Sequence, residues 1–143
     1  MKSAMVVLLG GAVLAGFATG GAAQSSRVAP SGPASPCNSG VCKIDVTVTD
    51  CGAAGGISVN RPLLSMSKKG SSTVIHCTIV TPGYVFAAGG IRFDPANANF
   101  QRLPGGQPNV IRMTNTKAAL GDFYYWVEVA NCVPLDPWIR NDP

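Results

Sequence analysis

Histidine and acidic residues are scarce in this sequence of 143 residues, which has one histidine, His76, and seven aspartates and glutamates. One imidazole cannot supply the two histidines of a blue-copper site. A hydrolytic triad would depend on His76 alone, and no G-x-S-x-G elbow accompanies it. No two acidic residues are close in sequence, as a glycosidase pair would be. The sequence therefore predicts no catalytic residue, no metal ligand and no cofactor. The alternative is a small metal-binding or thiol/disulfide redox protein that uses the cysteines or His76.

Long helical patterns and clustered basic residues are also missing. No stretch keeps an apolar helical period beyond one or two turns, which argues against a helical domain. The basic residues are scattered singly, apart from the pair Lys68-Lys69. A nucleic-acid-binding protein needs a clustered basic face, so we expect no nucleic-acid partner. We expect the two lysines to form a solvated hairpin turn with Gly70.

The N-terminus has the features of a secretory signal peptide. Lys2 precedes an apolar run over 4–17, and small residues at 21–23 offer a cleavage site. The apolar run is shorter than the roughly 18 residues of a membrane-spanning helix. We therefore expect residues 1–23 to be removed. The protein would then be periplasmic or secreted, without a membrane span.

The mature chain divides into a flexible leader and one domain. Residues 24–36 are rich in Ser, Pro, Gly and Ala, with almost nothing to bury, whereas 37–143 alternates short apolar segments with turn residues. The clearest strands are 43–50, 73–80 and 123–130, where apolar residues recur with a period of two. About seven to nine short strands predict an all-β, antiparallel β-sandwich.

The alternation also predicts which residues face the core. In the first of these strands they are Ile44, Val46 and Val48, and in the second Ile75, Cys77 and Ile79, which leaves His76 on the outer face. Pro62 indicates that the chain around it lies at a sheet edge or crosses between sheets. Tyr84–Phe86 and Ile91–Phe93 are expected as two short strands around a glycine-rich bend.

Five cysteines in an exported chain are expected to form disulfides, with at least one left over. Cys37 and Cys42 enclose a four-residue loop, and a bond there would hold the entry to the domain. Cys51 and Cys132 each follow a predicted strand. If those strands are neighbours, a bond would close a loop of about 80 residues, worth roughly 4 kcal/mol. Our hypothesis is that these two pairs are bonded and that Cys77 is a free, buried thiol.

Three segments, 43–51, 73–93 and 124–141, together resemble a group of small exported bacterial proteins of uncharacterised function. Those proteins combine a GYxFxxxGIxF-like block with a C-terminal aromatic strand and a DPxIxN ending. The resemblance implies an immunoglobulin- or cupredoxin-like sandwich and no particular activity. The matching residues are Gly83, Tyr84, Phe86, Gly90, Ile91 and Phe93, then Asp136, Pro137, Ile139 and Asn141.

The C-terminal aromatic residues suggest a binding surface. Tyr124 and Trp126 lie on the face opposite the predicted core, and Trp138 follows in the tail. These rings could stack on a carbohydrate or dock a protein. Alternatively, the tail covers them, with Trp138 as its anchor. Pro134 and Pro137 cannot continue a central strand, so we expect a short tail laid back on the domain.

In that tail, the motif of Asp136, Pro137, Ile139 and Asn141 is expected to have a structural role, with a capped turn at Asp136-Pro137. The sequence as a whole predicts an exported, non-catalytic binding or structural module of the cell envelope.

Overall fold

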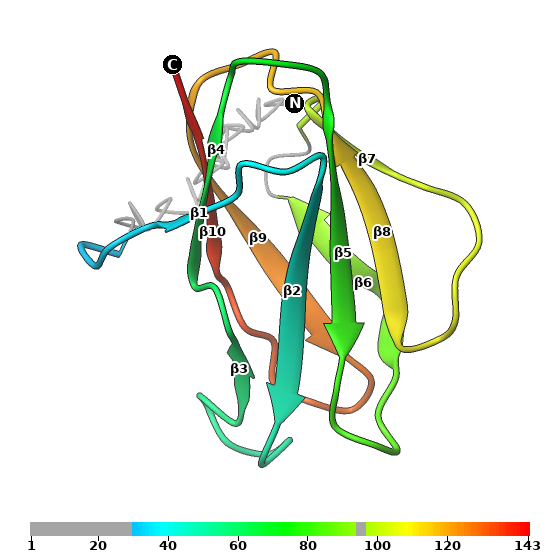
Figure 1. Cartoon of the computed structure of the whole chain (residues 1–143). Coiled ribbons are helices and arrows are strands. Elements are labelled where there is room, and N and C mark those ends of the chain that lie inside the picture. Colours follow the sequence, from blue (N-terminus) through cyan, green and yellow to red (C-terminus); the bar gives the residue numbers. More distant parts are fainter. Residues whose placement is uncertain (1–29, 94–96) are drawn as a thin grey trace, which may run out of the picture.

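The computed structural model describes residues 30–93 and 97–143. The predicted signal peptide and residues 24–29 of the predicted leader lie outside these ranges. The described chain forms ten strands and no helix, arranged as two five-stranded sheets packed as a sandwich (Figure 1). The strands are β1 (Ser35–Pro36), β2 (Val41–Val48), β3 (Ile57–Val59), β4 (Leu63–Ser67), β5 (Thr73–Ile79), β6 (Phe86–Phe93), β7 (Phe100–Arg102), β8 (Val110–Asn115), β9 (Gly121–Val129) and β10 (Trp138–Asp142).

Both sheets are mixed, so the expectation of an antiparallel sandwich is wrong in this respect. The first sheet has the order β1-β4-β10-β9-β6, and the second has the order β3-β2-β5-β8-β7. β4 is parallel to both β1 and β10, and β2 is parallel to β5. Parallel neighbours need a crossover connection. Here the connection from β2 to β5 runs through β3 and then through β4, which belongs to the opposite sheet. The chain therefore re-enters the second sheet at β5 running in the same direction as β2.

The link 60–62 carries the chain from one sheet to the other, as the position of Pro62 predicted. β3 is an edge strand of the second sheet, and β4 belongs to the first. The expected hairpin at Lys68-Lys69-Gly70 is wrong for the same reason. These residues join β4 to β5 across the end of the sandwich, because the two strands lie in different sheets.

The core lies between the sheets and follows the period of two in the sequence. The inward sets predicted for β2 and β5 are buried, and β9 adds Tyr125, Val127 and Val129 from the opposite side. Full burial of a Val, Leu or Ile side chain stabilises a fold by about 1.5–3 kcal/mol. The two sheets therefore hold each other in place mainly through these alternating residues.

The C-terminal segment is a strand, whereas we expected a tail. β10 lies between β4 and β9, with Trp138 opposite Tyr124 and Ile139 beside Leu64. Ile139 and Asn141 point into the core. A buried asparagine in a segment of five residues hides the apolar alternation, which is why the pattern did not reveal this strand.

β6 is one strand, although the sequence predicted two short ones. Its pairing with β9 shifts register between Phe86 and Ile91, so the glycine-rich bend lies within the strand. Gly90 has a φ of 58°, and a Cβ atom there would overlap the terminal methyl group of Ile111. Glycine is needed at this position both for the backbone conformation and for the close packing of the two sheets.

Candidate functional site

The structure joins Cys37 to Cys42 and Cys51 to Cys132, the two pairs expected from the sequence. Cys37 N also donates to Ser65 O at 2.8 Å, so the first disulfide connects the residue after β1, which lies beside β4, to the start of β2. The second bond links the turn after β2 to the turn after β9, where Val133 N donates to Cys51 O at 3.0 Å. Two disulfides suggest an oxidising, extracytoplasmic location.

Cys77 is the remaining thiol, and it is fully buried on β5. Burial raises the pKa of this thiol to about 12. Tyr125 faces it from β9, and burial, together with the charge that a Cys77 thiolate would carry, raises the pKa of Tyr125 well above its usual value. Because the thiolate is the reactive form of cysteine, Cys77 is a packing residue at neutral pH.

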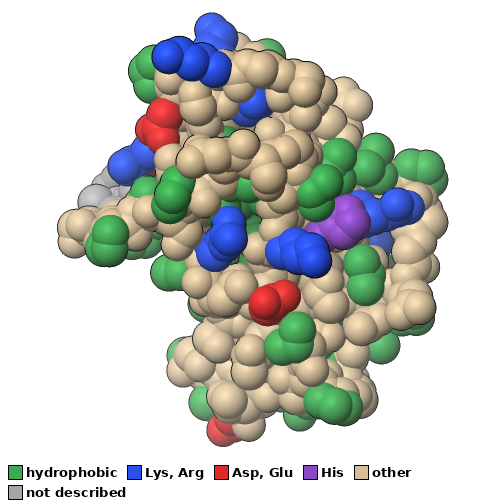
Figure 2. Space-filling view, in the orientation of Figure 1, with side chains coloured by type: hydrophobic (Ala, Val, Ile, Leu, Met, Phe, Trp, Pro, Cys, Tyr) green, Lys and Arg blue, Asp and Glu red, His purple; other side chains and the backbone are tan. Residues whose placement is uncertain are grey.

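His76 lies on the outer face of the second sheet, as the alternation predicted, and it is only partly exposed. Strand pairing places it directly between Lys43 of β2 and Arg112 of β8. Figure 2 shows this face, with lysine and arginine side chains on either side of the histidine. We call Lys43, His76 and Arg112 the basic row. These residues are scattered singly along the sequence, and the pairing of neighbouring strands brings them together.

The described part of the chain does not bring together a set of metal ligands. No group of three histidine, cysteine, aspartate or glutamate side chains there is close enough to hold a metal ion. Within the same residues, no helix is long and apolar enough to cross a membrane.

The three aromatic residues singled out in the sequence lie on the outer face of the first sheet. Tyr124 and Trp138 are register partners, and their ring centroids lie 5.5 Å apart. Trp126 lies two residues further along β9, with the Arg92 guanidinium 5.1 Å from its ring centroid. All three aromatic residues are partly exposed. We call Tyr124, Trp126 and Trp138 the aromatic strip.

An ion pair lies at each end of the aromatic strip. At one end Arg92 Nε donates to Glu128 Oε1 at 2.7 Å. At the other end Arg140 donates through Nε and Nη2 to the two carboxylate oxygens of Asp122, at 2.6 and 3.0 Å. The hydrogen bond from Arg140 lowers the pKa of Asp122, so this carboxylate stays ionised at neutral pH. Each arginine beside the strip is therefore paired with a carboxylate, and Asp142, the next outward residue of β10, adds one further negative charge.

The residues of the C-terminal motif are spread between surface and core. Asp136 is exposed, while Pro137 is buried and its carbonyl oxygen accepts a hydrogen bond from Tyr125 N at 3.0 Å. Ile139 and Asn141 are inward residues of β10. Sequence reasoning missed the partner of Asn141, which is Asn115 of β8, and it missed Arg92 beside Trp126. Both contacts join residues distant in sequence, and only the order of the strands reveals them.

Comparison of the chain with protein-family models and with curated proteins finds no match.

Proposed function

We propose that this protein is an exported, non-catalytic binding module of the cell envelope, periplasmic or secreted, and that its aromatic strip binds a neutral carbohydrate. The observation that carries the proposal is the arrangement of Tyr124, Trp126 and Trp138 as partly exposed rings between two ion pairs. Two of these rings belong to tryptophan, the residue with the largest apolar face.

The chemistry of this face suits a saccharide. Sugar rings present apolar C–H faces that stack on aromatic rings, and their hydroxyl groups both donate and accept hydrogen bonds. Arg92 and Arg140 offer N–H donors beside the strip, and Asp122 and Glu128 offer acceptors. Because both arginines are already paired with carboxylates, a charged ligand would have to compete with these ion pairs, whereas an uncharged one would not.

A protein that docks on the same strip is the other occupant to consider. Such a partner would cover the rings as the apolar centre of an interface, with the ion pairs at its polar rim. The flanking pairs favour a carbohydrate, since their donors and acceptors remain available to hydroxyl groups.

The test is a titration of the disulfide-bonded protein with a panel of neutral oligosaccharides, followed by tryptophan fluorescence and calorimetry. We expect saturable binding and at least a tenfold loss of affinity in Trp126→Ala, which corresponds to about 1.4 kcal/mol. His76→Ala is the matched control, because it removes a partly exposed ring from the opposite sheet. Equal binding by Trp126→Ala and the parent, or no binding to any member of the panel, would overturn the carbohydrate assignment. Disulfide reductase activity would support the redox alternative instead.

A further inference from the structure

Figure 1 shows the β4–β5 and β8–β9 connections at its top end. Residues of these connections and of the loop that follows Cys37 line a polar hollow. Its volume is about 360 Å³, and no acidic side chain lines it. The lining includes two lysines, several hydroxyl groups and one amide: Lys69, Lys117, Ser67, Ser71, Thr73 and Asn38.

Lys117 is an unusual residue in this hollow. Only 5% of its surface is exposed. Its backbone has a φ of 56°, which residues other than glycine rarely adopt. Its Nζ atom donates to the carbonyl oxygen of Lys69 at 3.2 Å. Lysine is almost never buried unless it is paired. The ion pairs of the described residues join arginines to acids, and none of them includes a lysine.

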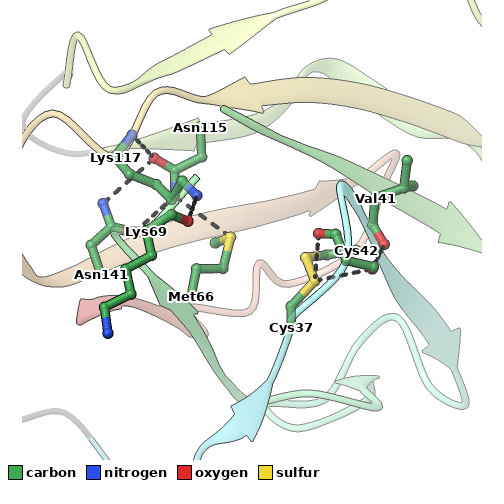
Figure 3. Close-up of a disulfide and its surroundings, with 9 residues drawn as sticks. Cys37, Val41, Cys42, Met66, Lys69, Asn115, Lys117 and Asn141 are labelled. Atoms are coloured by element: carbon green, nitrogen blue, oxygen red, sulfur yellow. Dashed lines mark hydrogen bonds between the residues drawn. A yellow bond between two sulfur atoms is a disulfide. The ribbon is translucent and has the colours of Figure 1, made fainter. Parts of the chain in front are cut away.

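Lys117 is held in place by the core beneath it (Figure 3). Its backbone N–H donates to Asn115 Oδ1 at 2.9 Å, and Asn115 Nδ2 donates to Asn141 Oδ1 at 2.8 Å. Asn141 Nδ2 in turn donates to the carbonyl oxygen of Ala119 at 3.0 Å. This network fixes the connection on which Lys117 lies, so the ammonium group is positioned before any ligand arrives.

The Cys37–Cys42 disulfide holds the opposite wall. It closes the short loop that contains Asn38 and Gly40, and Val74 N donates to Gly40 O at 2.9 Å. Figure 3 shows this disulfide in the same region as Lys69 and Lys117. Both walls of the hollow are therefore attached to the sheets.

We propose that this hollow binds a small oxyanion, a phosphate or carboxylate group, with Lys117 as its central cation. Lys69 adds a second positive charge, while Ser71 and Thr73 place hydroxyl groups on the same surface. Ammonium and hydroxyl groups donate hydrogen bonds to oxyanions, and charge-assisted bonds are about twice as strong as neutral ones. The bound anion would supply the negative charge that Lys117 lacks. This inference is independent of the proposed carbohydrate binding.

Titrations with inorganic phosphate and with acetate, followed by ¹⁵N NMR of the disulfide-bonded protein, test the proposal. We expect saturable shifts of the amides of residues 69–73 and 117 with at least one of the two anions. Saturation by phosphate alone would indicate a phosphate ligand, and saturation by acetate alone a carboxylate. Shifts that grow linearly with ionic strength, or no shifts with either anion, would overturn the proposal.

Variants locate the site. Lys117→Gln should weaken binding at least tenfold, while Lys43→Gln, which removes the same charge from the basic row, should leave it unchanged. An equal loss in both variants would mean general electrostatic attraction and would overturn the assignment. If Lys117→Gln does not fold, Thr73→Val takes its place, because it removes one hydroxyl group with little change of shape. Unchanged affinity in that variant would likewise contradict the site.

Discussion

Asn115 of β8 and Asn141 of β10 are hydrogen-bonded to each other across the interior of the sandwich, with Asn115 Nδ2 donating to Asn141 Oδ1 at 2.8 Å. The two residues come from different sheets, and both are buried. Buried polar groups favour a single arrangement of the elements around them, since a shift of either strand would leave donors without partners. The pair therefore fixes β10 relative to β8 and supports the connection that carries Lys117.

Replacing Asn141 with leucine should destabilise the protein by about 1–3 kcal/mol, because the amide of Asn115 and the carbonyl oxygen of Ala119 would lose their partner. Urea unfolding measures the effect. Asn38→Leu, a change at an exposed position, is the control and should have little effect. The double variant with Asn115→Leu should not restore full stability, since Lys117 N would lose its acceptor as well. Parent-like stability of Asn141→Leu would contradict this role for the pair.

The two disulfides should contribute unequally to stability. Cys51 and Cys132 are 81 residues apart, and Cys37 and Cys42 are 5 apart. Chain entropy predicts a loss of roughly 4 kcal/mol for the Cys51→Ser/Cys132→Ser variant and roughly 2 kcal/mol for Cys37→Ser/Cys42→Ser. Denaturant unfolding of both variants gives the comparison. Losses in the reverse order would show that native contacts, rather than loop closure, determine the contribution of each bond.

The Cys37→Ser/Cys42→Ser variant should also weaken oxyanion binding, because the loop with Asn38 would lose its covalent closure. We expect at least a threefold loss of affinity for the anion that binds the parent, measured by the same NMR titration. Cys51→Ser/Cys132→Ser is the matched control, since neither of these cysteines lines the hollow. Full affinity in the first variant would mean that the disulfide does not position the wall.

Stability should fall in alkaline solution. The pKa of Cys77 is about 12 in the folded protein, against an ordinary value of 9.0, so folding favours the protonated thiol. This contribution is complete below about pH 9 and is lost as the pH rises toward 12, by at most about 1.4 kcal/mol per pH unit. Tyr125 acts in the same direction, because its pKa is raised as well. Cys77→Ala should therefore show a weaker decline between pH 9 and 11 in denaturant unfolding, and an unchanged decline would contradict the assignment.

The sequence was sufficient to predict burial or exposure for residues whose environment depends only on the strand that contains them. The period of two assigned the inward faces of β2 and β5, and it placed His76 outside. The cysteines at the ends of the strands suggested the bonds that the structure contains. These features follow from local geometry, because side chains of a strand alternate between two faces.

Features that depend on which strands are neighbours could not be predicted from the sequence. The basic row exists because Lys43, His76 and Arg112 lie on three adjacent strands of the second sheet. The parallel pairs, the Asn115–Asn141 contact and the hollow around Lys117 depend equally on strand order. β10 was missed because its inward face has one apolar residue and one asparagine, a pattern as typical of a turn as of a strand.

The position of β10 leads to a test that separates a central strand from a surface tail. Ile139 is fully buried between β4 and β9, so Ile139→Ala should cost about 2–5 kcal/mol, as expected for a core position. In a tail laid on the surface the same change would cost less than about 1 kcal/mol. Val133→Ala is the matched control, since Val133 is an exposed aliphatic residue in the link between β9 and β10. Urea unfolding of both variants decides between the two arrangements, because a small and equal effect of the two changes would exclude β10 from the core.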